Sequence, residues 1–197
     1  MSLPDVSLRF DSDAPLSSFF DVEAASLPDP EVTPGPVEAL VAARGETVIL
    51  VRCLTPEFDD YDSFDPAASS WDLRLVKALI SSPSEKEART LAGRGIDATV
   101  RATVPSTCAV QADRPGQPDH VVRVPGATSL SVDRVDGVWT VAIGGEEYAV
   151  SLGSGGVLLV ALPRTAYCDL VVREVRRDRH PFTGVTKLSV YLQEVVG

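Results

Sequence analysis

Apolar and polar residues alternate through much of the chain after residue 95. From residue 96 to 105, apolar side chains occupy every second position and polar side chains lie between them. A period of two places the two sets on opposite faces of an extended strand, so this segment predicts a half-buried β-strand. Asp136-Gly137 and Gly144-Gly145 indicate hairpin turns. Further strands are expected at 120–124, 129–135, 138–143, 148–152, 157–162, 168–176 and 185–195.

The first half of the chain carries two helix signals. Residues 36–44 begin with proline, which suits a first helical turn, and a glycine follows as a candidate C-cap. Ser84 lies three residues before Glu87, the spacing of a capping box, and predicts a short helix that ends at Gly93 or Gly95. The β-branched run 47–54 predicts a strand, residues 56–70 predict a long loop, and residues 71–81 fit either a helix or a strand.

Prolines interrupt the N-terminal region at six positions up to residue 36. Because proline lacks a backbone donor and disfavours helix before it, residues 1–45 predict an extended arm that ends in the short helix. Phe19 and Phe20 are unusual in such an arm, and we expect them to anchor it either on the chain's own core or in a neighbouring subunit. The short, frequently punctuated strands that follow predict an antiparallel barrel or sandwich.

Charge is unevenly distributed along the chain. The formal net charge is −10, and residues 1–65 contain fourteen acidic and three basic residues. A freely acting nucleic-acid binder needs a basic face, so this class is disfavoured, and the acidic segment is either a solvated surface or an arm that docks on a basic partner. No apolar run reaches the roughly 18 residues of a membrane-spanning helix, and the N-terminus lacks the pattern of a signal peptide.

Few patterns in the sequence point to catalytic chemistry. The glycine-rich run 153–156 precedes an apolar strand rather than Lys-Ser/Thr and a helix, so a hairpin turn explains it better than a phosphate-binding loop. His120 and His180 have no partner at metal-ligand spacing, and we expect each to be a surface or strand-end histidine. The aspartates of 56–70 lack the spacing of a calcium loop. We therefore expect no metal, no cofactor and no enzymatic activity, but an interaction or structural protein.

Several ordered segments resemble a known family. Residues 71–105 combine an ordered element, a Ser-Pro-Ser-Glu-Lys-Glu helix start and an alternating strand that ends in Val-Pro-Ser. Two further turn and strand signatures are carried by Asp119, Val121, Val124 and Gly126 and by His180, Pro181, Thr183, Gly184 and Lys187. Over residues 46–125 and 166–194 the chain resembles head–tail connector proteins of long-tailed, siphovirus-like viruses of bacteria and archaea, most of all the head-closure or stopper group.

The resemblance implies a small antiparallel β-barrel over 46–197 with one or two short helices, the extended arm, and a β insertion at about 127–165. It implies a homo-oligomeric ring, expected to be a dodecamer, in the virion neck, made in the host cytoplasm and without a membrane partner. The portal and adaptor would lie above the ring and the tail terminator or tail tube below it. Such a ring helps to retain or gate packaged DNA.

Three sets of residues become candidates under this interpretation. The expected channel-facing loop comprises Glu57, Asp59, Asp60, Asp62 and Asp65. A second set forms either a contact to a partner or DNA, or a charged strand edge: Arg173, Arg176, Arg177 and Arg179. Of these, Arg173, Arg177 and Arg179 would share one face of the strand. Phe19 and Phe20 would anchor neighbouring subunits. The alternatives are a tail-terminator or tail-completion ring and a soluble β-barrel binding module for a peptide or carbohydrate.

Overall fold

The computed structural model describes residues 36–61, 63–108, 110, 119–153, 156–179 and 186–195. Phe19, Phe20, Asp62 and most of the 178–184 turn, including His180, lie outside these residues, as do the side chains of residues 67, 179 and 186. The described elements all belong to one compact unit, Pro34–Gly197.

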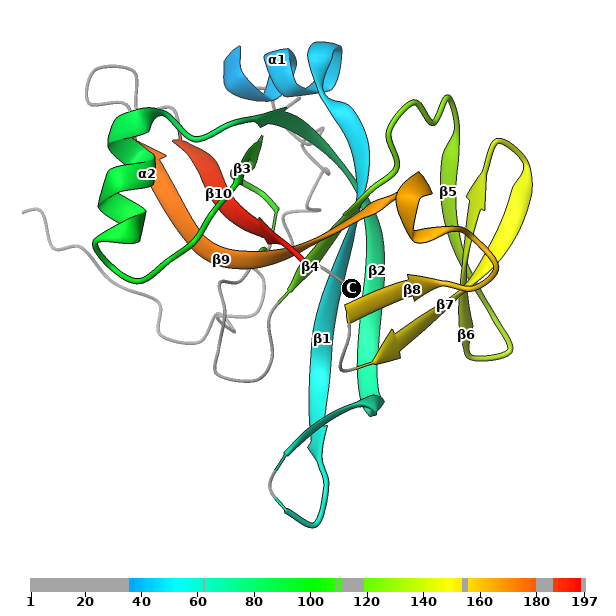
Figure 1. Ribbon diagram of the computed structural model, residues 1–197. Helices are drawn as coiled ribbons and strands as arrows, with labels where there is room; N and C mark the ends of the chain where they lie inside the picture. The colour runs from blue at the N-terminus through cyan, green and yellow to red at the C-terminus, as the bar shows by residue number, and fades with distance from the viewer. Residues whose placement is uncertain are drawn as a thin grey trace, which may run out of the picture. The chain divides into compact units, whose positions relative to one another are not determined.

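The described residues form ten strands and two α-helices, with a short 3₁₀ turn at Arg164–Ala166 (Figure 1). Their bounds are α1 Pro36–Arg44, β1 Glu46–Phe58, β2 Phe64–Ser81, α2 Glu85–Ala92, β3 Val100–Pro105, β4 His120–Arg123, β5 Leu130–Val135, β6 Val138–Ile143, β7 Glu146–Gly153, β8 Gly156–Leu159, β9 Cys168–Arg179 and β10 Thr186–Glu194.

Six strands close into an antiparallel barrel in the order β1-β2-β3-β10-β9-β4. Closure depends on β4, which pairs with β1 on one side and with β9 on the other. The interior is filled by small and branched apolar side chains from all six strands. This arrangement confirms the expected mainly β, antiparallel fold.

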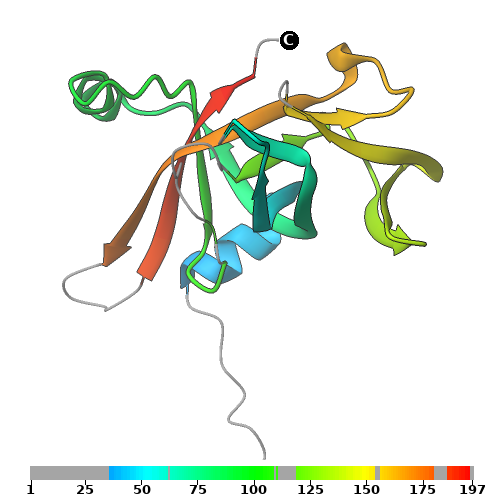
Figure 2. The ribbon, with the colours of Figure 1, turned by 90° about the horizontal axis from the view of Figure 1, so that it is seen from below.

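The remaining strands form a second sheet in the order β5-β6-β7-β8. Figure 2 shows this sheet beside the barrel, and in both views it lies on the opposite side from α2. Val48 and Leu50 of β1 point into the barrel, whereas Ile49 and Val51 belong to a second core shared with the added sheet. Both faces of β1 are therefore buried, which explains its uninterrupted apolar run.

Local signals located the helices well. The predicted helix at 36–44 is α1, and α2 begins at the predicted capping box, in which Glu87 N donates to the Ser84 hydroxyl and Ser84 N donates to Glu87. Residues 71–81 are strand. The strand expected from residue 96 begins only at Val100, because the backbone N–H of Ile96 donates to Leu91 O and closes the end of α2 instead.

Candidate functional site

The β1–β2 hairpin extends well beyond the barrel and forms the long projection at the bottom of Figure 1. β1 pairs with β4 only over residues 49–51, and β2 pairs with β3 only over residues 79–81. The β1–β2 pairing itself continues to Phe58 and Phe64. The outer hairpin is thus a two-stranded ribbon, an arrangement that is marginally stable on its own.

This hairpin replaces the loop predicted for residues 56–70, so that prediction is wrong. Pro56 and two register shifts interrupt the strand pairing there, but serine hydroxyls take the place of the missing backbone acceptors. Glu57 N donates to Ser69 Oγ (2.9 Å), and Thr55 N donates to Ser70 Oγ (3.1 Å). These side-chain bonds let a sequence rich in Pro, Ser and Asp continue as a ribbon.

The tip of the hairpin collects the acidic residues that were expected to face a channel. Asp59 Oδ1 accepts from Tyr61 N (2.9 Å) and Ser63 N (2.8 Å), and Asp65 Oδ1 accepts from Ala68 N (3.2 Å). These two carboxylates therefore shape the turn. Glu57 and Asp60 are exposed on the same ribbon, and Asp62 lies outside the described residues.

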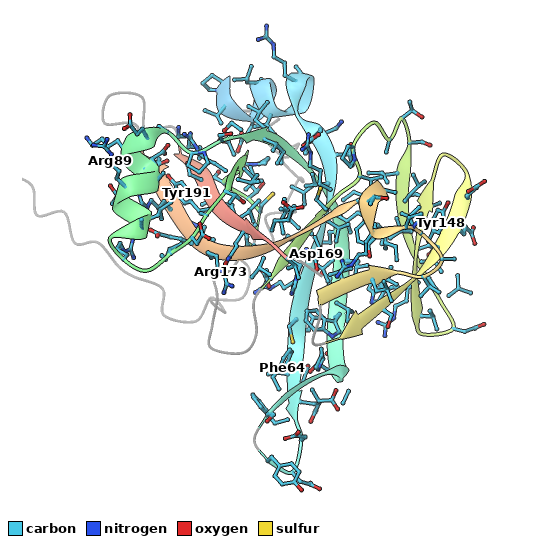
Figure 3. The ribbon with its side chains drawn as sticks, viewed as in Figure 1. Phe64, Arg89, Tyr148, Asp169, Arg173 and Tyr191 are labelled. Carbon is cyan, nitrogen blue, oxygen red and sulfur yellow. The ribbon has the colours of Figure 1, made fainter. Side chains whose placement is uncertain are left out.

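Aromatic side chains accompany these carboxylates along the hairpin. Phe64 lies edge-on between Phe58 and Trp71, with ring centroids 6.2 and 6.1 Å away. Phe58 is 50 % exposed and Tyr61 88 % exposed, and Leu54 is exposed as well. Figure 3 shows side chains projecting to both sides of the hairpin beyond Phe64. A projecting ribbon with exposed apolar groups is typical of a contact element.

A pocket of about 430 Å³ lies at the base of the hairpin, lined by residues of β2, β4, β7, β8, β9 and the end of β10. One of these residues is His120, whose side chain is only 9 % exposed, and whose Nδ1 lies 2.8 Å from Oδ1 of the fully buried Asp169. Asp169 Oδ2 also accepts from Val157 N (2.7 Å). Figure 3 shows Asp169 near the centre, where barrel and second sheet meet.

Gly156 makes this contact sterically feasible. Its φ is +91°, and a Cβ atom built there would lie 2.2 Å from Asp169 Oδ2. Strand β8 is also held by Tyr167, whose hydroxyl accepts from Leu159 N and donates to Val157 O, both at 3.2 Å. Asp169 of β9 and Tyr167, which directly precedes β9, thereby satisfy backbone groups of β8 and fasten the second sheet.

Sequence reasoning missed this buried pair. His120 begins β4, as a strand-end residue, but it is buried rather than at the surface. The available signal was Asp169, an acid inside the otherwise apolar run that starts β9, because a buried carboxylate needs hydrogen-bond partners.

The arginines of β9 are not brought to one face as expected. β9 contains a one-residue register shift against β10: Val172 pairs with Leu192, but Glu174 pairs with Tyr191. The extra residue, Arg173, therefore lies on the opposite face from the Arg177 and Arg179 positions. Arg173 Nε donates to Gln193 Oε1 (2.8 Å), so it faces the pocket side.

Arg176 belongs to a polar network that fastens α2 to the barrel. It donates to Glu174 (2.7 Å) and lies over the ring of Tyr191, whose hydroxyl donates to Glu87 (2.7 Å). Hydrogen bonds from Ser84 and Tyr191 lower the pKa of Glu87 to about 2. Burial, assisted by Glu87, raises the pKa of Tyr191 to about 12. These groups support the fold, and Arg176 is engaged locally.

Comparison with protein-family models, curated proteins and solved structures finds no match to this chain. In the part of the chain that the structure describes, no helix is long and apolar enough to cross a membrane. Nor do the described His, Cys, Asp and Glu residues form any group of three that could hold a metal ion. The projecting hairpin and the pocket at its base are therefore the two candidate sites.

Proposed function

We propose that the chain is a structural subunit of the neck of a long-tailed virion: a head-closure, or stopper, ring that joins the portal–adaptor complex to the tail and helps to retain packaged DNA. The observation that carries this proposal is the β1–β2 hairpin, which projects from a closed barrel and bears exposed aromatic and acidic side chains. The family resemblance of the sequence supports the same role.

A closed barrel suits a ring subunit. Because the barrel is closed, none of its six strands is an unpaired edge strand, so neighbouring copies do not polymerise by strand pairing through that sheet. Contacts between copies in a ring are instead heterologous, with a projecting element of one copy meeting a different surface of the next. Tyr61 and Phe58 offer the apolar area for such a contact, which would also stabilise the ribbon.

The acidic groups fit the DNA-facing part of the role. Glu57 and Asp60 are exposed on the ribbon near its tip. Carboxylates repel DNA phosphates, so a hairpin tip that lines a channel would let DNA slide past without binding it. The hairpin thus unites a contact surface with a surface that does not adhere to DNA.

Tip variants assayed during particle assembly test the proposal. Phe58→Ser with Tyr61→Ser should leave the free subunit folded but yield DNA-filled heads that lack tails or lose DNA. Val135→Ser is the control, because Val135 is an apolar residue on β5, away from the hairpin, that is about as exposed as Phe58. Normal yields of tailed, DNA-retaining particles from the double tip variant would refute the proposal.

A second candidate function, a soluble binding module, is favoured by the pocket at the base of the hairpin. The pocket of about 430 Å³ falls in the size range of ligand sites and has aromatic walls from Phe64 and Trp71. A binding module would remain a monomer and take up its ligand in the absence of other virion proteins. Sedimentation of the purified chain with and without neck partners separates the two candidates, because only the ring subunit is expected to assemble with those partners.

A further inference from the structure

The pocket at the base of the hairpin has a hydrogen-bonding atom on its wall. His120 lines this pocket with a side chain that is only 9 % exposed, and its Nδ1 lies 2.8 Å from the Asp169 carboxylate. That carboxylate accepts the Nδ1 proton and fixes the ring, so Nε2 of the neutral ring is an acceptor. Nε2 has no hydrogen-bond partner among the described residues, and a buried acceptor of this kind favours a ligand that carries a hydroxyl or N–H group.

The rest of the pocket suits an aromatic ring. Phe64 and Trp71 provide aromatic surface, and Val171 and Val195 provide aliphatic surface. The volume of about 430 Å³ accommodates one aromatic side chain together with the short segment that carries it. A phenol ring, whose hydroxyl is a donor, therefore matches both the walls and the acceptor.

The tip of the hairpin presents a side chain of this kind. Tyr61 is 88 % exposed, the largest exposed fraction among the large hydrophobic side chains of the described residues. Asp60 precedes it and is exposed as well. Two successive residues of the tip thus offer a phenol ring, a hydroxyl donor and a carboxylate, and the ring is not covered by its own copy.

Charge favours the meeting of these two surfaces. Residues 57–61 contain three acids and no base. Arg173 lines the pocket and is partly buried, whereas Glu194, the one acid among the described lining residues, is exposed and more strongly screened by solvent. The acidic tip is therefore attracted to the Arg173 side of the pocket.

We propose that Tyr61 at the hairpin tip of one copy docks in the pocket at the base of the hairpin of a second copy, where its hydroxyl donates to Nε2 of His120 and its ring packs against Phe64 and Trp71. Tip and pocket are different surfaces of the same chain, so the contact is heterologous, and each copy binds one neighbour with its tip and another with its pocket. Such a contact closes a ring when the rotation between copies permits it. The inference rests on the proposed function, in which the hairpin meets a neighbouring copy, and identifies the surface that the tip meets.

Complementation between two variants of the full chain tests this contact. Tyr61→Ser removes the ring from the tip and keeps the pocket, whereas Val195→Trp fills the pocket and keeps the tip. Val195 follows the last strand, so its replacement spares the barrel. In sedimentation velocity at high protein concentration, wild type should form dimers and larger species, and each variant alone should remain monomeric. An equimolar mixture should form dimers and nothing larger, because only one intact tip and one intact pocket remain to pair.

The control and the contrary results follow from the same assay. Val160→Trp is the matched control, because Val160 is exposed and does not line the pocket, and it should assemble like wild type. A monomeric wild type, assembly of either variant alone, or a mixture that stays monomeric would overturn the proposal. The assay contains no other virion component, so its result is separable from that of particle assembly. Defective particles from the tip variant with a monomeric mixture would refute this contact alone, and the reverse result would refute the neck role alone.

A double-mutant cycle tests the hydrogen bond itself. His120→Asn keeps an amide nitrogen near the position of Nδ1, and so a donor to Asp169, but lacks Nε2. Tyr61→Phe, which removes only the hydroxyl, should weaken association about two- to tenfold in the wild-type background. In the His120→Asn background the same change should weaken association by less than about twofold. An equal loss in both backgrounds would refute the pairing of the hydroxyl with Nε2.

Discussion

Replacing Gly156 with alanine is expected to detach the second sheet from the barrel. Both Gly156 and Gly137 adopt positive φ angles, +91° and +83°, so alanine at either position carries backbone strain of about 1–2 kcal/mol. At Gly137 nothing lies within 4 Å of the added Cβ, whereas at Gly156 Asp169 Oδ2 lies 2.2 Å away. The difference between the two variants therefore isolates the collision with Asp169.

The magnitude follows from the bonds that Asp169 makes. Its carboxylate must move, which breaks or stretches the contacts with Val157 N and His120 Nδ1. Hydrogen bonds to charged groups contribute about 1.5–3 kcal/mol each, so with partial relaxation Gly156→Ala should cost about 3 kcal/mol more than Gly137→Ala. That is a large fraction of a typical free energy of unfolding of about 5–15 kcal/mol.

Urea unfolding followed by tryptophan fluorescence and circular dichroism measures this difference. A double-mutant cycle sharpens it: in an Asp169→Ala background the oxygen is gone, so Gly156→Ala should cost only the strain seen at Gly137. Equal destabilisation by Gly156→Ala and Gly137→Ala, or an unchanged cost of Gly156→Ala after removal of the carboxylate, would refute the reasoning.

Two further predictions concern the barrel. Glu87→Gln should lower the free energy of unfolding by about 1 kcal/mol at pH 7, a modest value because the site is partly exposed. The pKa of Glu87 is lowered from 4.5 to about 2, so the stabilisation by its carboxylate is complete above pH 4.5 and is lost as the pH falls through 2. The stabilities of wild type and variant should therefore converge in acid. A difference in unfolding free energy between wild type and variant that is as large at pH 2 as at pH 7 would contradict this sign. Leu50→Ala, which empties a position inside the barrel, should cost about 2–5 kcal/mol, whereas Leu54→Ala on the exposed hairpin should change stability by less than about 0.5 kcal/mol, and equal urea midpoints would contradict the assignment of the two faces.

Local rules predicted the parts of the fold that local interactions determine. The bounds of α1 and the capping box of α2 follow from residues within one helical turn of each other. The hairpins at Asp136-Gly137 and Gly144-Gly145 follow from turn residues with positive φ. Sequence alone was sufficient there because neither feature depends on a distant partner.

Features that depend on distant partners were not predicted. The outer β1–β2 hairpin looks like a loop in the sequence because its backbone bonds go to Ser69 and Ser70, twelve or more residues away. The His120–Asp169 pair joins residues 49 positions apart and requires the barrel to close first. The bulge at Arg173 is visible only in the pairing with β10, so strand periodicity placed the β9 arginines wrongly.

The copy number of this chain in purified virions, measured by quantitative mass spectrometry against the portal protein, tests the proposed neck role most directly. A head-closure ring that matches the portal predicts one copy of the chain per portal subunit. Half that ratio would indicate a six-fold terminator ring instead. Absence of the chain from tailed, DNA-filled particles would contradict the structural role altogether.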